Sequence, residues 1–344
     1  MSGPLKGFGV CLTCRLPVRE IVGWARTAES YGIGSLWVNE SHYYRSAFSA
    51  LSAVAVSTEK IALGTAVVSV FGRHPALLAM EAATLDELSG GRLLLGLGAT
   101  PVWGDPSPLR EGERPLRALR EATEIVRGLL ARELKEYHGR AFTMVPSDHW
   151  SETGTSLNFP PLRKRLPLYF GVKGPKLLRL AGAIADGVIL TNPSPLPYVQ
   201  QCIGEIQRGA EAAGRDLSDF TTAAFITFSI GEDRRMAREA TREMLATYVD
   251  HVGEGLGPFL GLSGEELDAY HRAFQSGGVK AAAPLVTEDL IDRLAVAGGP
   301  EECLERLLAY REAGLDLPIA FHTLGPDRAR ALRLIGERLV PKLT

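Results

Sequence analysis

The sequence predicts an α/β protein built as a (β/α)8 TIM barrel with insertion segments. Three observations predict this fold. Apolar runs of strand length alternate with helical segments along the 344 residues, and this alternation repeats eight times. The strand runs are apolar at nearly every position, as expected for strands that are covered on both faces. No G-x-G-x-x-G motif follows the first strand, which disfavours a two-domain dinucleotide-binding fold.

The expected strands are short apolar runs bounded by glycine, proline or polar residues. They are residues 6–12, 35–38, 61–70, 93–97, 166–171, 186–191, 220–230 and 317–321. Helical periodicity predicts helices at about 17–31, 46–58, 75–88, 116–133, 174–185, 196–213, 234–251, 300–313 and 328–339. Residues 137–166 and 253–298 break the alternation. We therefore expect one domain, residues 1–344, with two excursions from the barrel.

The helix after the third strand predicts its own packing. It starts at a proline, where the missing N–H is not needed, and it ends at a Ser-Gly-Gly sequence. Four large apolar residues recur about three or four positions apart in it: Leu77, Met80, Leu85 and Leu88. We expect this stripe to lie on the sheet.

Composition and charge limit the classes of function. The chain is 45% hydrophobic and 23% charged with a formal net charge of -2, which argues against nucleic-acid or membrane-surface partners. No apolar run is long enough to cross a bilayer, and no signal peptide is recognisable. Four cysteines are too few for a disulfide scaffold. These features predict a cytoplasmic protein that acts on a small molecule.

In a barrel of this type the ligand lies in the loops that follow the strands. The most informative loop is residues 171–176, Gly-Val-Lys-Gly-Pro-Lys. Its glycines allow backbone amides to approach a ligand, and a helix N-terminus with two nearby lysines attracts anions. The loop therefore predicts a phosphate cradle, with a tight turn carrying solvated lysines as the alternative.

Other polar residues follow the first three strands. Glu40 and His42 are candidates for proton transfer or cofactor binding, and a solvated loop pair is the alternative. His74, directly before a proline, is expected to serve the entry of a helix. Cys11 and Cys14 have redox-dithiol spacing, but a structural role is favoured because they follow a strand. No metal site is expected, and the H-E-x-x-H, G-x-S-x-G and Walker motifs are absent.

Four segments carry a resemblance to a known family. They are ARTAESYGIGSLWVNES, IALGTAVVSVFGRHPALLAMEAATLDELSGGRLLLGLG, LPLYFGVKGPKLLRLAGAIADGVILT and GAEAAGRDLSDFTTAAFITFSIGED. With these segments the chain resembles the bacterial luciferase-like flavin barrels over nearly its whole length. It is most similar to the branch that uses the deazaflavin coenzyme F-420, and within that branch to methylenetetrahydromethanopterin reductases.

The resemblance implies which residues bind the cofactor. Ala66 and Val67 match a bulge with a non-proline cis peptide that presses on the deazaflavin. The other implied contacts surround the ring, the ribityl chain and the phosphate: Glu40, Ser69, Gly98, Ala99, Thr100, Gly171, Val172, Lys173, Gly174, Pro175, Thr191, Asn192 and Arg293. Proton transfer would fall to Glu40 or His42.

Three departures from the reductases concern the substrate side. Their first strand carries a glutamate where this chain has Cys11, and an acidic residue after their fourth strand is here Pro101. The Asp-His pair of the wider family is Glu40-Ser41, with His42 one place later. The resemblance therefore does not imply methylenetetrahydromethanopterin as the substrate.

Together these observations predict an oxidoreductase that transfers hydride between the deazaflavin of coenzyme F-420 and a C=C or C=N double bond of an organic substrate. An FMN-dependent luciferase-like monooxygenase is the first alternative, because the phosphate loop would also suit FMN. A non-catalytic flavin-binding protein is the second. A homodimer is expected from the apolar helix surfaces and from the family.

Overall fold

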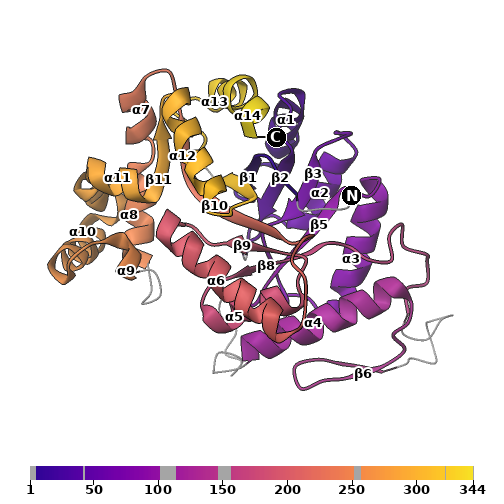
Figure 1. Cartoon of the computed structure of the whole chain (residues 1–344). Helices are drawn as coiled ribbons and strands as arrows, with labels where there is room; N and C mark the ends of the chain where they lie inside the picture. Colours follow the sequence, from indigo (N-terminus) through magenta and orange to yellow (C-terminus); the bar gives the residue numbers. More distant parts are fainter. Residues whose placement is uncertain are drawn as a thin grey trace.

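Eight parallel strands form a closed ring in the computed structural model, which describes residues 5–41, 43–100, 114–145, 156–251, 257–321 and 323–343. In ring order they are β1 (Gly9–Thr13), β2 (Ser35–Asn39), β3 (Ala62–Thr65), β5 (Leu93–Gly98), β8 (Leu168–Val172), β9 (Gly187–Leu190), β10 (Thr221–Ile230) and β12 (Leu317–Phe321). The ring closes through the parallel pairs β9–β10 and β12–β1. The predicted (β/α)8 barrel is thereby confirmed (Figure 1).

The strands are apolar throughout because both of their faces are buried. Side chains at alternate positions point to opposite faces of a strand. The inward positions form a cluster inside the barrel, which includes Cys11, Trp37, Tyr169, Ile189, Phe225, Ile319 and Phe321. The outward positions pack against the helices in a larger cluster. Gly64 makes room for the Trp37 ring, since a Cβ there would lie 2.0 Å from it.

Helices surround the ring on its outer side (Figure 1). They are α1 (Val18–Ser30), α2 (Ala47–Ala55), α3 (Pro75–Leu88), α4 (Arg114–Ala131), α5 (Pro175–Ile184), α6 (Leu196–Ala212), α12 (Pro300–Glu312) and α13 (Arg328–Leu334). The last helix continues through a π turn, η3 (Ile335–Leu339), into α14 (Val340–Leu343). Side chains cap several N-termini, as His74 does for α3 by accepting a hydrogen bond from the Ala76 N–H at 3.2 Å.

The predicted packing stripe of α3 is wrong for three of its four residues. Leu77, Met80 and Leu88 are 50%, 44% and 44% exposed, and only Leu85 is buried. The buried face consists of Leu78, Ala79, Ala82, Ala83, Leu85 and Asp86. Alanines let the helix approach the sheet closely, whereas the three large side chains point outward. Apolar spacing alone could not separate these two faces, because both carry hydrophobic residues.

The third strand is interrupted rather than continuous over 61–70. After β3 the chain makes a cis peptide between Ala66 and Val67 and then forms β4 (Val68–Ser69), which pairs with β5. A non-proline cis peptide at these two residues was implied by the resemblance and is confirmed. The interruption pushes the chain toward β5, where a Cβ on Gly96 would lie 2.0 Å from the Thr65 carbonyl oxygen.

Two segments lie outside the regular alternation. In the first, β6 (Tyr137–His138) and β7 (Thr143–Met144) form a short antiparallel pair. The second contains α7 (Arg234–Glu239), α8 (Arg242–His251), α9 (Gly257–Leu260), α10 (Gly264–Ala282), η2 (Ala283–Leu285), α11 (Glu288–Leu294) and β11 (Ala295–Gly298). The helix predicted at 234–251 is thus two helices, separated where the Thr241 hydroxyl donates to the Arg238 carbonyl. The strand β11 was not predicted. It pairs in parallel with the C-terminal part of β10.

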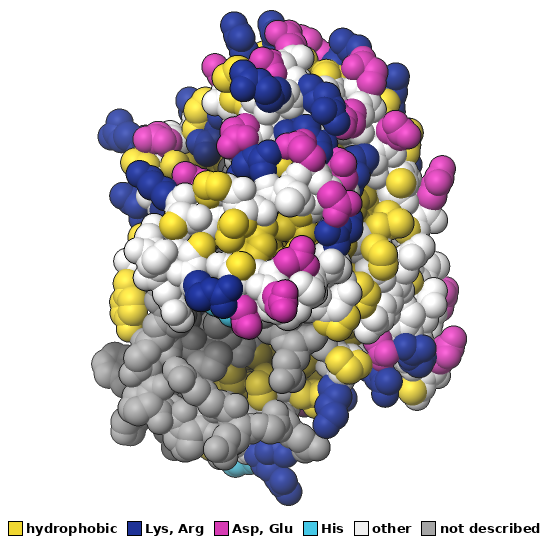
Figure 2. Space-filling model, turned by 90° about the vertical axis from the view of Figure 1, so that its left-hand side faces the viewer, with side chains coloured by type: hydrophobic (Ala, Val, Ile, Leu, Met, Phe, Trp, Pro, Cys, Tyr) yellow, Lys and Arg dark blue, Asp and Glu magenta, His cyan; other side chains and the backbone are white. Residues whose placement is uncertain are grey.

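We call the segment from α7 to β11 the α7–β11 module. It has a hydrophobic cluster of its own, which includes Leu245, Leu260, Tyr270, Leu290 and Ile291. Charged side chains of both signs are interspersed over the upper part of the face that this module presents (Figure 2). That distribution is typical of a solvated surface.

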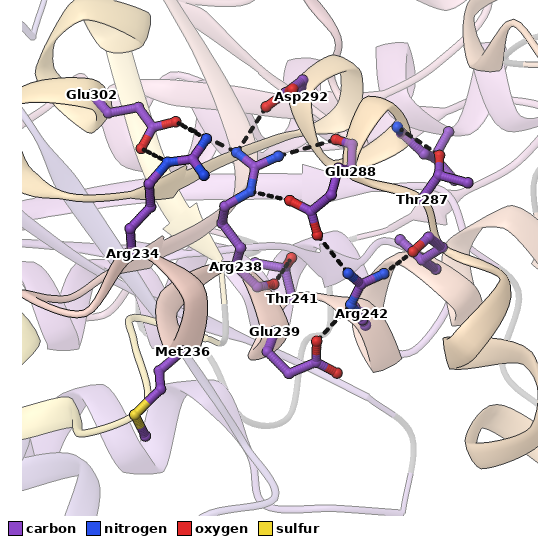
Figure 3. Close-up of polar contacts among 12 residues, drawn as sticks. Arg234, Met236, Arg238, Glu239, Thr241, Arg242, Thr287, Glu288, Asp292 and Glu302 are labelled. Atoms are coloured by element: carbon purple, nitrogen blue, oxygen red, sulfur yellow. Dashed lines mark hydrogen bonds and ion pairs between the residues drawn. The ribbon is translucent and has the colours of Figure 1, made fainter.

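An ion-pair network ties the module together and to the barrel (Figure 3). The Arg238 side chain is only 4% exposed and reaches Glu288 at 2.6 Å, Asp292 at 2.8 Å and Glu302 at 3.4 Å. Burial alone would lower the pKa of Arg238, but the carboxylates of Asp292 and Glu288 hold that pKa above its ordinary value. Arg242 also bonds Glu288, at 2.5 Å. Four helices, α7, α8, α11 and α12, are joined by these contacts.

No helix among the described residues is both long and apolar enough to cross a bilayer. No group of three or more His, Cys, Asp or Glu side chains there is arranged to hold a metal ion.

Candidate functional site

A pocket of about 270 Å³ opens at the carboxyl ends of the strands, where the fold predicts a ligand site. The residues that line it come from seven of the eight barrel strands and the loops that follow them: Asn39, Glu40, Ser41, Ala66, Val67, Ser69, Gly98, Thr100, Gly171, Ile189, Thr191, Phe225 and Phe321. Eight predicted site residues are among them: Glu40, Ala66, Val67, Ser69, Gly98, Thr100, Gly171 and Thr191. Predicted site residues as far apart in the sequence as Glu40 and Thr191 are thus brought to one cavity by the parallel strands.

One wall of the pocket is the bulge at Ala66 and Val67. The Val67 side chain sits between two strand ends, and a Cβ would lie 2.4 Å from it at Gly98 and 2.6 Å from it at Gly171. Only glycine at both positions lets the bulge approach β5 and β8 this closely. The end of β4 is tied to the loop after β5, because the Ser69 hydroxyl donates a hydrogen bond to the Thr100 carbonyl oxygen at 2.5 Å.

The predicted catalytic residue Glu40 lines the pocket, but its carboxylate is already engaged. Arg73 donates from Nη1 to Oε1 at 2.5 Å and from Nη2 to Oε2 at 3.1 Å. The Ala47 N–H at the start of α2 donates to Oε2 at 2.9 Å. Hydrogen bonding to Glu40 raises the pKa of Arg73, so this guanidinium stays charged. A carboxylate whose oxygens already accept hydrogen bonds from a guanidinium and a backbone N–H is suited to binding and orienting a ligand.

Arg73 is a functional candidate whose pairing the sequence analysis missed. It also lies 3.2 Å from a carboxylate oxygen of Glu81, and burial raises the pKa of that glutamate. A signal existed in the sequence, because Glu40 and Arg73 follow the second and third strands, which are neighbours in a barrel. The other predicted catalytic residue, His42, lies outside the described residues.

The predicted phosphate turn starts at the pocket and runs outward. Gly171 lines the pocket, Val172 ends β8, and Gly174 adopts a φ of +85° directly before Pro175 opens α5. Lys173, Gly174 and Pro175 are exposed. The turn therefore presents a helix N-terminus to solvent beside the cavity, as a phosphate cradle requires.

The structure also places four other residues that the sequence analysis considered. Asn192, which precedes a cis proline, accepts a hydrogen bond from the Thr227 hydroxyl at 2.9 Å. Ala99 lies between two residues of the pocket wall, Gly98 and Thr100. Arg293 does not line the pocket, since its guanidinium bonds the Leu260 carbonyl and, at 2.6 Å, Asp289. His74 caps α3, as expected.

The cysteine pair has the structural role that the sequence favoured. Cys11 and Cys14 are both unbridged and buried. The Cys14 sulfur accepts a hydrogen bond from the Ser41 N–H at 3.4 Å. Burial raises the pKa of Cys11 far above its ordinary range, so this thiol stays protonated. Cys11 belongs to the cluster inside the barrel and does not line the pocket.

Aromatic residues form a pocket wall that the sequence analysis did not identify. Phe225 on β10 and Phe321 on β12 have ring centroids 4.4 Å apart. Tyr248 from α8 packs beside Phe321, with ring centroids 6.4 Å apart. Strand periodicity placed Phe225 and Phe321 in strands, but it did not show which strand faces meet the ligand.

Comparisons with known proteins agree with this architecture. Residues 7–317 match the family described as luciferase-like monooxygenase. The chain is 31% identical over 344 residues to the 5,10-methylenetetrahydromethanopterin reductase of Archaeoglobus fulgidus, covering 98% of this chain and 99% of that protein. It is 28% identical to the F-420-dependent glucose-6-phosphate dehydrogenase of Microbacterium testaceum, covering 94% of this chain and 93% of that protein.

A solved structure gives the same result at the level of the backbone. The coenzyme F-420 dependent tetrahydromethanopterin reductase of Methanopyrus kandleri superposes with a TM-score of 0.88 at 28% identity, over 99% of this chain and 100% of that chain. The sequence resemblance to luciferase-like barrels is thereby confirmed. The closed barrel, the interrupted third strand and the matches over almost the full length show that the chain belongs to the luciferase-like monooxygenase family.

Proposed function

We propose that this protein is a coenzyme F-420-dependent oxidoreductase that transfers hydride between carbon 5 of the deazaflavin and a C=C or C=N bond of an organic substrate. One observation carries the proposal. A pocket walled by the Ala66–Val67 bulge continues at Gly171 into a helix N-terminus flanked by Lys173 and Lys176. The names of full-length relatives at about 30% identity support F-420 as the cofactor.

The residues present suit such a cofactor. A flat ring system would lie against the bulge, whose Val67 side chain is admitted between β5 and β8 by the glycines at 98 and 171. The phosphate would lie at the exposed start of α5, where free backbone amides and two lysines favour an anion. When bound, the coenzyme supplies the hydride chemistry. The chain orients the reactants and excludes water with Ile189, Phe225 and Phe321.

The substrate is proposed to differ from methylenetetrahydromethanopterin. Cys11 lies buried in the barrel where the reductases carry a glutamate, and its raised pKa keeps it uncharged. Pro101, at the second departure, lies outside the described residues. This chain therefore lacks two acidic side chains that the reductases carry on the substrate side of their pocket.

Cofactor titration tests the proposal against its two alternatives. We expect purified protein to bind F-420 and, in its reduced form, to pass hydride to an unsaturated acceptor, followed by the change in deazaflavin absorbance. Tight binding of FMN without affinity for F-420 would instead support a luciferase-like monooxygenase. Binding of F-420 without turnover on any acceptor would support a non-catalytic flavin-binding protein.

We also propose that the protein works as a homodimer. The outward stripe of α3, Leu77, Met80 and Leu88, supports this because it exposes large apolar side chains along one face of a helix. The double substitution Leu77→Glu with Met80→Glu places charges on this face. It should lower the molar mass measured by light scattering from that of two chains to that of one. A mass of one chain for the unsubstituted protein would disprove the proposal.

A further inference from the structure

A buried amide at the β9–β10 side of the pocket has hydrogen-bonding capacity left over. Asn192 directly follows Thr191, which lines the pocket, and Asn192 is 7% exposed. Its Oδ1 accepts from the Thr227 hydroxyl, but its Nδ2 has no hydrogen-bond partner among the described residues. Because buried polar groups are rarely left unsatisfied, this amide group is expected to meet an acceptor on a ligand.

A second donor reaches the same place from the α7–β11 module. Tyr248 on α8 packs against the cluster inside the barrel and beside Phe321. The Asn192 amide and the Cys11 thiol both act on the pKa of its hydroxyl, so both side chains lie near it. Burial raises the pKa of Tyr248 to about 12, opposed in part by Asn192. The hydroxyl therefore keeps its proton at neutral pH and can donate a hydrogen bond.

The charge of the pocket selects the kind of molecule that these donors can bind. Glu40 is the one ionisable side chain among the described lining residues, and Arg73 neutralises it. A cationic substrate such as an iminium would lie here without a counter-charge, which is unfavourable in a buried site. The Phe225–Phe321 wall instead favours a neutral molecule with an apolar body.

We propose that the Asn192 amide and the Tyr248 hydroxyl bind the carbonyl oxygen of a neutral α,β-unsaturated carbonyl compound, with its C=C bond as the hydride acceptor. This assignment rests on the proposed function and narrows its substrate class. Two donors on one oxygen act as an oxyanion hole for the enolate that hydride addition creates.

The reaction balances with these groups. Hydride leaves carbon 5 of the reduced deazaflavin and forms a C–H bond at the β-carbon, so the coenzyme is oxidised by two electrons and the substrate is reduced by two. The C=C electron pair moves to give the enolate. Tyr248 passes its proton to the enolate oxygen, and a proton from solvent then restores the tyrosine. The enol takes up a solvent proton at its α-carbon and releases its hydroxyl proton to solvent, so that one hydride and one proton in total are added across the C=C bond.

Tyr248→Phe tests the proposal, with Tyr270→Phe as a matched control. Tyr270 is a buried tyrosine in the core of the same module and does not line the pocket. With reduced F-420 and cyclohexenone, Tyr248→Phe should lower kcat/KM on the order of 10²-fold, whereas the control stays near the unsubstituted enzyme. In calorimetric titration with oxidised F-420 present, Tyr248→Phe should weaken cyclohexenone binding about five- to tenfold. Affinity for F-420 itself should stay unchanged.

The outcomes separate this inference from the proposed function. Turnover of Tyr248→Phe within twofold of the unsubstituted enzyme would overturn the role of Tyr248. Reduction of the cyclic imine pyrroline, without reduction of cyclohexenone or other conjugated ketones, would overturn the substrate class and leave the proposed function standing. Absence of F-420 binding would remove the proposed function, and this inference with it.

Discussion

The pocket at the barrel rim and the α7–β11 module use polar groups in opposite ways. In the module the charges saturate one another, since the buried guanidinium of Arg238 contacts three carboxylates. At the rim, space and polar groups are left over: a cavity of about 270 Å³ remains open, and the Asn192 Nδ2 has no partner in the described part of the chain. A fully used polar group stabilises the fold, whereas unused capacity beside a cavity indicates a ligand site.

The contact between β5 and the interrupted third strand, next to the pocket, should tolerate added volume least. Gly96→Ala places a Cβ 2.0 Å from the Thr65 carbonyl oxygen and should lower the free energy of unfolding by about 3 kcal/mol, because backbone has to move. The matched control is Gly204→Ala on α6, where the nearest atom would be 3.9 Å away. There the better helix propensity of alanine should stabilise by up to about 1 kcal/mol. Urea denaturation of both variants measures the contrast, and equal effects would contradict the close-packing argument.

The module should depend on its saturated charges. Arg238→Ala leaves Glu288, Asp292 and Glu302 without their shared counter-charge. We expect it to cost about 2 kcal/mol of unfolding free energy, below the value for a fully buried pair because the carboxylates are partly exposed. Arg338→Ala removes the exposed pair with Glu301 and should cost less than about 1 kcal/mol. Denaturant midpoints that do not distinguish the two variants would show that burial of Arg238 is unimportant.

A carboxylate whose oxygens are fully hydrogen-bonded also predicts that stability depends on pH, and Asp186 at the start of β9 is such a group. Asp186 bonds Arg127 at 2.9 Å, Arg165 at 2.7 Å and the Leu168 N–H at 3.0 Å. Burial would raise the pKa of Asp186, but these partners hold it below its ordinary value of 3.8. A lowered folded pKa contributes stability above the unfolded pKa, and this contribution is lost as pH falls through the folded pKa.

Asp186→Asn should therefore cost about 1–2 kcal/mol at pH 7. Its unfolding free energy should converge with that of the unsubstituted protein as the pH falls below the ordinary aspartate pKa. Thermal denaturation of both proteins over a series of pH values measures this. A difference that stays constant into acid would mean that the charge of Asp186 is not what stabilises this region.

The smallest expected effect concerns the exposed phosphate turn. Lys173→Ala should weaken F-420 binding about fivefold at low salt and by less at high salt, because the pairing is screened by ions. Lys164→Ala, an exposed lysine before β8, should leave the affinity unchanged. Fluorescence titration at two salt concentrations checks both. A loss of affinity that does not depend on salt would argue against a direct charge contact by Lys173.

Local patterns predicted the barrel better than they predicted the pocket. Each apolar run forms a strand, because a strand that is buried on both faces needs apolar residues at consecutive positions, as in Leu93–Gly98. The break in 61–70 was implied by resemblance to a family and not by the run itself. The outward stripe of α3 and the aromatic wall were missed, since spacing identifies an element more readily than the face it buries.

The sequence by itself determined the alternation of strands and helices, the glycines at 96, 98 and 171, and the Gly-Pro turn that opens α5, because each depends on residues close together in the chain. Only the tertiary structure decided that Arg73 neutralises Glu40, that Val67 fits between Gly98 and Gly171, and that Tyr248 packs beside Phe321. These contacts join residues from different strands and from the α7–β11 module. Their partners are chosen by closure of the barrel, which no local pattern contains.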